Sequence, residues 1–506
     1  MTGQRAEDPS HLLILFEKVL GMKTFRFSSG IAAVAVVVWA VGGCTVGPDY
    51  QRPQMDLPEQ WSAEDVTAHV DPETLTHWWT AFDDPVLISL IEQADANSLD
   101  LQAALARIEQ SRALRAFAAG EKLPSLEASR SYTRTRASAK SPQAIPGGGS
   151  PGEQSLYTSR FDAFWEIDVF GRIRRSVEAA DAELERSWED YHDVRLSLFA
   201  EVARNYIELR TAQMRLHYAR ANVEIQRQTL RLTQNRYEAE IAPELDVSQA
   251  RLVLANTEAE IPSLRIAETA AINRLAVLAG TTPHDLREIL AITGTLPEIQ
   301  ALPGAGVPAE LLRRRPDIRS AERALAAQTA RIGIATSQRY PSFSLAGMLG
   351  FQATHFSDMT NWDSRMYSFG PQMRWLLFDG FRVTSLIAVE DARSQQLAAA
   401  YESTVLHAVE EVENALIGLA QEQQRAEALV RSVEAARDAL EKVETLYRSG
   451  LADFQRVLDV QRSLALQEDR LAISEGLVLQ QAVALYKALG GGWDDGDIAD
   501  DGLDSP

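Results

Sequence analysis

Two stretches of the chain, each more than sixty residues long, have the character of continuous helix. Residues 173–237 contain neither proline nor glycine, and residues 383–448 contain only Gly418. At 1.5 Å per residue, each stretch would extend for roughly 95 Å, which is far longer than a globular domain. A sharp turn at 240–244 or 450–454 follows, and then a second helical stretch with apolar residues at spacings of three and four. This pattern predicts two long hairpins with coiled-coil-like packing.

A pattern of period two precedes each long helix. Apolar residues alternate with polar ones in two segments, at Phe161, Ala163, Trp165, Ile167 and Val169, and at Tyr367, Phe369, Met373, Trp375 and Leu377. One apolar and one polar face suit a strand between lipid and water, although the edge of a soluble sheet would show the same alternation. Upstream of each segment we expect a helix, at Leu87–Ala118 and at Asp317–Ser337, followed by a Pro-Ser step and a first strand.

The chain is therefore two copies of one unit. A shift of 210 residues superimposes the sequence from Trp165 to Gly280 on its second copy without a gap, and a shift of 217 does so upstream. The first copy has seven extra residues, in a stretch rich in proline, glycine and serine that we expect to be an exposed loop. We divide the chain into 1–43, 44–85, a first repeat at 86–280, a connector at 281–313, a second repeat at 314–490 and a tail at 491–506.

Two strands in each copy give four per chain, within a mainly α fold of the α+β class. Strands in lipid must close into a barrel, because an open edge leaves backbone groups unpaired. Four strands are too few, since known barrels begin at about eight. We therefore expect several chains to share one barrel, with eight strands from two chains or twelve from three.

The N-terminus carries a short apolar run, from Ile31 to Val41, where a bilayer-spanning helix needs about twenty residues. Basic residues precede the run, and Gly42, Gly43 and Cys44 follow it. This arrangement predicts a bacterial lipoprotein signal over 1–43, with the true start at Met22 and a covalent lipid on Cys44. The alternative is a buried helix that ends at an unmodified cysteine. Apart from the lipid, no cofactor is expected.

Composition excludes several functions. With 50 Lys+Arg against 71 Asp+Glu, the net charge of -21 argues against binding nucleic acid. The single cysteine excludes an internal disulfide, and the eight histidines lack the spacing of metal ligands. No nucleophile with a neighbouring base emerges, so the chain is not expected to be an enzyme.

Several motifs together resemble the TolC-like outer-membrane factor family, and within it the lipoprotein channels of RND-type efflux systems, the NodT-like group. The resemblance covers almost the whole mature chain. The resemblance rests on Cys44 with residues 47–53, on Trp78-Trp79 with Phe82 and Asn97, and on the segments 165–172, 311–318 and 485–493. It implies a homotrimer with a twelve-stranded barrel in the outer membrane, a periplasmic helical tunnel, and an equatorial domain built from 281–313 and the termini.

The resemblance also implies a periplasmic gate at the hairpin tips. By position, the gate residues are Asp246, Tyr447, Gly450, Arg456 and Asp459. Some members have a second acid where this chain has Arg456, so a mixed layer in which Arg456 pairs with Asp459 is one reading. Three copies of a carboxylate near an axis would form a negative ring that attracts cations. For each charged residue, a solvated helix face is the alternative.

The resemblance implies a passive exit duct for small amphiphilic compounds such as drugs, in the outer membrane of a Gram-negative bacterium. Its partners would be a periplasmic adaptor, an inner-membrane RND-type transporter and outer-membrane lipid. A channel for type I secretion or metal-ion export is the alternative within the family. A lipid-anchored coiled-coil scaffold without a pore is the alternative outside it.

Overall fold

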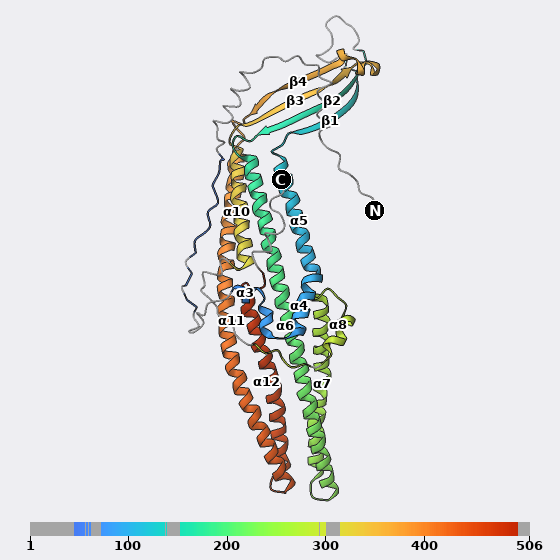
Figure 1. The fold of residues 1–506 in the computed structure, drawn as a ribbon, viewed down its shortest axis with the longest axis vertical. Coiled ribbons are helices and arrows are strands. Elements are labelled where there is room, and N and C mark those ends of the chain that lie inside the picture. The colour runs from blue at the N-terminus through green and yellow to red at the C-terminus, as the bar shows by residue number, and fades with distance from the viewer. Residues whose placement is uncertain are drawn as a thin grey trace. The chain divides into compact units, whose positions relative to one another are not determined.

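The computed structural model describes residues 45–55, 57–58, 60–61, 72–136, 138, 152–292, 294–299 and 314–493 (Figure 1). These residues divide into two compact units. The first consists of 45–46, 124–174 and 337–377 and contains the sheet. The second contains most of the helical residues. Within the described residues, no helix carries an apolar stretch long enough to cross a bilayer.

The sheet has four antiparallel strands in the order β1-β2-β3-β4. They are β1 (Ser125–Thr135), β2 (Gln154–Ile167), β3 (Ser342–Ala353) and β4 (Arg365–Arg374). The first repeat meets the second where β2 pairs with β3, as at Phe161↔Leu349 and Trp165↔Leu345. Two short 3-10 turns, η2 (Phe356–Thr360) and η3 (Trp362–Ser364), join β3 to β4. The outer strands β1 and β4 each have one neighbour, so the sheet of a single chain has two edges.

Two strand ends differ from the sequence expectation. The alternation predicts strand through Val169 and Leu377, but β2 ends at Ile167 and β4 ends at Arg374. After Ile167 the backbone turns, and the Val169 N–H donates to the Ile167 carbonyl at 2.8 Å. Beyond Arg374 there is no partner in β3, because β3 begins at Ser342, directly opposite Arg374.

The helices repeat at the offsets found in the sequence. Helix α6 (Arg172–Glu238) corresponds to α11 (Arg382–Arg448), and α7 (Glu244–Leu278) corresponds to α12 (Phe454–Ala488), both at 210 residues. At 217 residues, α5 (Leu99–Gly120) corresponds to α10 (Pro316–Ser337). The mainly helical fold, with four antiparallel strands and a duplicated order of strands and long helices, is confirmed.

The single helix expected at Leu87–Ala118 was wrong. The structure has α4 (Pro85–Asn97) and α5, separated at Ser98, whose ψ is 128°. Asp84 caps α4 by accepting the Val86 N–H at 2.8 Å. The break gives each helix its own buried stripe, formed by Leu87, Leu90, Ile91 and Ala94 in α4, and by Leu101, Ala104 and Ile108 in α5.

The helical unit has two apolar cores. The larger surrounds Trp78, which stacks on Tyr486 with ring centroids 5.4 Å apart. Three short helices border it, namely α3 (Pro72–Thr76), η1 (Trp78–Phe82) and α8 (Pro283–Leu290). The smaller core lies at the hairpin tips and is built mainly from α11 and α12, with Val443, Tyr447, Phe454, Val457 and Leu458 among its members. This second core positions the predicted gate residues.

Candidate anchor and gate sites

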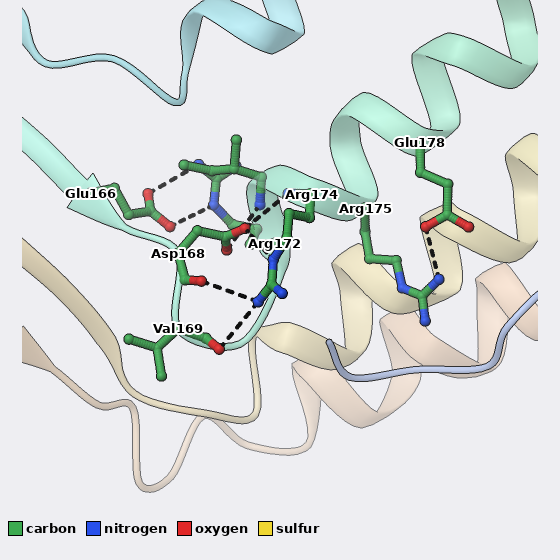
Figure 2. Close-up of polar contacts among 8 residues, drawn as sticks. Glu166, Asp168, Val169, Arg172, Arg174, Arg175 and Glu178 are labelled. Atoms are coloured by element: carbon green, nitrogen blue, oxygen red, sulfur yellow. Dashed lines mark hydrogen bonds and ion pairs between the residues drawn. The ribbon is translucent and has the colours of Figure 1, made fainter. Parts of the chain in front are cut away.

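The turn from β2 into α6 is built from paired charges (Figure 2). Glu166 at the end of β2 accepts two hydrogen bonds from the Arg172 guanidinium, at 2.8 and 2.9 Å. Asp168 accepts the backbone N–H groups of Ile173 and Arg174, at 3.2 and 2.9 Å. These amides open the helix and have no intrahelical acceptor, so the Asp168 carboxylate satisfies them and complements the helix dipole.

The residues that follow Cys44 lie against this turn. The Val46 N–H donates to the Phe170 carbonyl at 3.2 Å. Gly171 has φ +81°, and a Cβ there would lie 2.8 Å from the Cγ2 of Thr45. Only glycine therefore suits this position. Cys44 itself lies outside the described residues, so its acylation stays a prediction.

The next segment, 47–52, is fixed to helices of the helical unit. Gly47, at φ +93°, approaches Gly333 so closely that an added Cβ would lie 2.5 Å from its Cα. Arg175, whose side chain is 3% exposed, donates to Asp49 at 2.7 Å. The Tyr50 hydroxyl donates to Glu322 at 3.1 Å. These contacts give the segment a structural role, as a strap after the predicted lipid anchor.

The two hairpin tips share one turn geometry. Glu240 and Gly450, which correspond at the 210-residue offset, both have left-handed backbones, with φ of 61° and 76°. In each tip the next N–H reaches back five residues, from Ile241 to the Arg236 carbonyl at 2.8 Å and from Leu451 to the Leu446 carbonyl at 2.9 Å. This is the Schellman closure of a helix end. Gly450 is therefore a backbone requirement of the turn.

Tyr447 lies inside the tip core and does not project from it. It is 4% exposed, and its ring lies 5.5 Å from that of Phe454. Burial raises the pKa of its hydroxyl. Its counterpart in the first repeat, Tyr237, is 45% exposed. The same residue type thus has different surroundings in the two tips.

Arg236 connects the first hairpin to the second. Its Nη1 donates to the Tyr447 carbonyl at 2.8 Å, and its guanidinium carbon lies 4.6 Å from the centre of the Tyr447 ring. The contact combines a charge-assisted hydrogen bond with a cation–π interaction. Sequence reasoning missed Arg236. The available signal was a departure from the repeat, because the equivalent position in the second copy is Leu446.

Asp246 lies beside the same contact. Its carboxyl is partly buried, and this burial raises its pKa. The nearby Arg236 guanidinium acts in the opposite direction, and the Asp453 carboxylate from the other hairpin raises the pKa further. The structure thus brings Asp246, Arg236 and Tyr447 together across the two hairpins of one chain.

Arg456 and Asp459 lie on the exposed side of the second tip. Arg456 is 3.7 Å from Asp453, and Asp459 is 3.9 Å from Arg462 while accepting from Gln455 at 3.0 Å. Within the described chain, Arg456 therefore pairs with Asp453 and Asp459 with Arg462, while a mixed layer of Arg456 and Asp459 from several copies stays a prediction. Sequence reasoning also missed Asp453, the N-cap of α12, which accepts the Arg456 N–H at 3.0 Å. An aspartate just before a helix start is a recognised signal.

Comparison with known proteins identifies the chain. The family model described as "Outer membrane efflux protein" matches residues 90–281 and 307–491, which together form more than half of the sequence. This chain belongs to the outer membrane efflux protein family. The match covers both repeats, so the expected family is confirmed.

Relatives of this outer membrane efflux protein match it over most of their length. Nodulation protein T of Rhizobium leguminosarum bv. trifolii is 33% identical over 89% of this chain and 94% of its own. An antibiotic efflux pump outer membrane protein of Pseudomonas putida, ArpC, is 29% identical over 92% of this chain and 96% of its own. The solved outer-membrane channel OprN superimposes with a TM-score of 0.82 at 38% identity, over 89% of this chain and all of OprN.

Farther from the hairpin tips, this outer membrane efflux protein joins α6 to α12 by polar contacts, which we call the polar seam. Gln461 donates to Thr229 at 2.7 Å, Asn222 donates to the buried Glu468 at 2.8 Å, and Arg215 pairs with Asp469 at 2.6 Å. The helices α11 and α12 pack through the apolar tip core, against which Ile225, Leu230 and Leu232 of α6 also pack. Arg437 of α11 pairs with Glu468 at 2.8 Å, so α12 combines apolar and polar contacts with both neighbours.

Proposed function

We propose that the protein is the outer-membrane exit duct of a tripartite efflux pump. Three copies would combine their sheets into a twelve-stranded barrel and their hairpins into a periplasmic tunnel. A periplasmic adaptor and an inner-membrane RND-type transporter would supply small amphiphilic compounds, drugs among them. A lipid on Cys44 would add an anchor beside the β2–α6 turn, where Thr45 and Val46 lie.

The proposal rests chiefly on the contact between Arg236 and Tyr447. A gate needs an element with two arrangements, and this contact joins the two hairpins at their tips, where the apolar core is built mainly from α11 and α12. Farther along, α6 and α12 meet through the polar seam, and both contribute apolar residues to the larger core. Hydrogen bonds at the tips can exchange for bonds to water as the hairpins part, whereas separating α11 from α12 would expose the tip core. We therefore assign opening to a movement of the α6–α7 tip relative to the α11–α12 tip, while the larger core stays intact.

Charge at the tips supports conduction of cations and cationic compounds. Asp246, Asp453 and Asp459 lie within one tip region, and a trimer would repeat each of them three times. Like charges gathered around an axis raise the local concentration of the opposite sign. Arg456 lies 3.7 Å from Asp453 and so offsets part of this charge.

The test is single-channel conductance of the purified protein in planar bilayers. Arg236→Ala removes both contacts with Tyr447, so we expect a larger open fraction and a higher mean conductance than in the wild type. Arg231→Ala is the matched control, because Arg231 is an exposed arginine on the same helix. Equal conductance in Arg236→Ala and wild type would remove the gate assignment. No conductance from any variant would overturn the duct itself.

A further inference from the structure

The apolar face of the sheet ends at a row that carries two arginines. Directly opposed residues of neighbouring strands share a face, and one such row across all four strands contains Arg130, Ser159, Phe351 and Arg365. The adjacent uncharged row, toward the strand ends that connect to helices, contains Ala128, Phe161, Leu349 and Tyr367. Positive charge therefore borders the apolar surface at both edges of the sheet, at Arg130 in β1 and at Arg365 in β4.

The length of the apolar surface agrees with a membrane. Met373 lies eight residues beyond Arg365 in β4, a distance of about 20 Å across a bilayer once the strand tilts by about 40°. This span is comparable to the apolar band of about 25 Å that outer-membrane barrels present to lipid. At the Met373 end, the strands connect along the chain to α5, α6, α10 and α11. In the duct proposed above these helices are periplasmic, so the arginine row lies at the headgroups of the outer leaflet.

Each arginine lies against an aromatic ring of the connection between β3 and β4. The guanidinium carbon of Arg130 is 5.6 Å from the centre of the Phe356 ring. The guanidinium carbon of Arg365 is 4.8 Å from the centre of the Trp362 ring, and its Nη1 donates to the Trp362 carbonyl at 2.9 Å. Stacking on a ring fixes the plane of a guanidinium and leaves the N–H groups at its edge able to donate.

The two arginines of this row lack the carboxylate partner that neighbouring arginines have. Arg134, farther along β1, pairs with Glu153, and Arg160 on the opposite face pairs with Asp162 at 2.9 Å. Among the described residues, neither arginine of the row forms an ion pair, and none of the strand residues on their face is acidic. A guanidinium matches the oxygens of a phosphate in a bidentate contact. The row thus favours an anion from outside the chain.

We propose that Arg130 and Arg365 bind the phosphates of the glycolipid that forms the outer leaflet, a disaccharide with a phosphate at each end and several acyl chains. The inference rests on the outer-membrane function proposed above. Three strand spacings, or about 14 Å, separate the two arginines, so a headgroup with two phosphates suits them better than a headgroup with one. The acyl chains lie on the apolar rows, where Phe161 and Leu349 are 54% and 57% exposed.

Two tyrosines mark the level of this headgroup. Tyr132 and Tyr157 are opposed in the row beyond the arginines, with ring centroids 4.7 Å apart. The Tyr132 hydroxyl lies 3.2 Å from the Ser155 hydroxyl. Amphipathic rings of this kind collect at the membrane–water boundary. The tyrosines alone would indicate only a boundary, whereas the unpaired arginines add a charge that selects an anionic lipid.

Native mass spectrometry of the purified protein in detergent tests the proposal, with diphosphorylated lipid A as the probe. We expect the double variant Arg130→Gln, Arg365→Gln to bind this lipid about 30-fold more weakly than the wild type, since each arginine near an anionic lipid contributes about fivefold. Arg374→Gln is the matched control, because Arg374 is an exposed arginine of β4 on the opposite face. Equal retention of the lipid by the double variant and the wild type would overturn the proposal.

Other ligands separate the phosphates from the acyl chains. Lipid A without its phosphates keeps the acyl chains, and the wild type should bind it as weakly as the double variant binds the diphosphorylated form. Equal binding of both forms by the wild type would reduce the site to apolar contact. Phosphatidylglycerol has one phosphate and should bind more weakly, so binding equal to that of lipid A would overturn the assignment to the glycolipid. Displacement of the lipid by inorganic phosphate would assign the row to free phosphate.

A charge-preserving variant tests the stacked geometry. Arg130→Lys with Arg365→Lys keeps both charges but loses the planar donors, so we expect an affinity between those of the wild type and the glutamine variant. Thermal unfolding followed by circular dichroism establishes that both double variants fold as the wild type does. Wild-type affinity in the lysine variant would show that charge alone suffices and would overturn the bidentate contact.

Failure of the site and failure of the duct are distinguishable, because conductance in planar bilayers is measured on the same protein. A wild type that conducts but does not prefer diphosphorylated lipid A leaves the duct standing and overturns the site. Lipid binding that depends on the two arginines, in a protein without conductance, leaves the site standing and overturns the duct.

Discussion

At the scale of single residues, the two hairpin tips show that two different residue types can adopt the same backbone conformation. Gly450 adopts its left-handed φ without strain, whereas Glu240 holds the same conformation with a Cβ. The sequence could predict Gly450, because glycine at a helix end is a strong signal. It could not predict the strained Glu240, the buried Tyr447 or its contact with Arg236, since these depend on which helices meet.

Replacing Gly450 with alanine should loosen the second tip. An added Cβ at Gly450 meets no neighbouring atom, so the effect comes from the backbone alone, about 1 kcal/mol for an L-residue at positive φ. The Leu451 amide, which donates to the Leu446 carbonyl, should then exchange with deuterium about fivefold faster. Gly120→Ala is the control, because Gly120 also has open space but no positive φ. Equal protection in both variants would contradict the assignment.

Asp246 should make the proposed gate sensitive to pH. Its pKa is raised above the ordinary value of 3.8, so the closed tip binds a proton more tightly than separated hairpins do. The carboxylate therefore weakens the closed tip once pH rises through the raised pKa, and acidification relieves that effect. We expect the open fraction in bilayers to fall as pH is lowered from about 7 to about 4.

Asp246→Asn separates this effect from other titrations. The amide mimics the protonated carboxyl, so the variant should stay closed more often at neutral pH and show a flatter response. Glu238→Gln removes a charge from the exposed end of α6 and should leave the pH response unchanged. An undiminished response in Asp246→Asn would assign the effect to another group.

At the scale of elements, the start of α6 depends on one carboxylate. Asp168 accepts the two amides that open this 67-residue helix, while Glu178 pairs with the buried Arg175 one turn along (Figure 2). The alternation in the sequence predicted strand up to Val169. It therefore could not show that Asp168 lies beyond the end of the strand and caps a helix. The break at Ser98 was missed for a similar reason, since local periodicity continues across it.

Removal of the Asp168 carboxylate should destabilise the helix start. Asp168→Ala leaves the Ile173 and Arg174 amides without their acceptor, and we expect a loss of about 1–2 kcal/mol in the free energy of unfolding. Glu224→Ala removes the exposed ion pair that Glu224 makes with Arg227 on the same helix, at 2.6 Å, and should change stability by less than about 1 kcal/mol. Urea denaturation followed by circular dichroism compares the two variants. A larger loss from Glu224→Ala would show that the cap matters less than the pair.

At the scale of the whole molecule, duplication was the most predictable feature. The offsets of 210 and 217 read from scattered identities, such as Trp165 with Trp375, recur in the bounds of helices throughout the chain. The two copies nevertheless differ in sequence at positions whose side chains make different contacts. Position 236 is arginine and position 446 is leucine, and the hydrogen bond from Arg236 to the Tyr447 carbonyl shows why the hairpins are not interchangeable.

The lipid anchor can be separated from insertion of the sheet. Cys44→Ser should abolish labelling by radioactive palmitate, while the protein still reaches the outer-membrane fraction, because the apolar face around Phe161 and Leu349 is unchanged. Sucrose-gradient fractionation measures the distribution, with the unaltered Thr45–Val46 contacts retained in both proteins. Loss of the variant from the membrane would show that the anchor, and not the sheet, determines location.

The unequal loops have a practical consequence. The segment between β1 and β2 is seven residues longer than the one between β3 and β4, and its flanks are fixed at Thr135↔Gln154. Opposed strand residues lie about 5 Å apart, so an inserted peptide would begin and end at neighbouring points. Longer loops add little closure entropy. This segment thus suits the insertion of an epitope, and the proposed trimer would carry three copies of it.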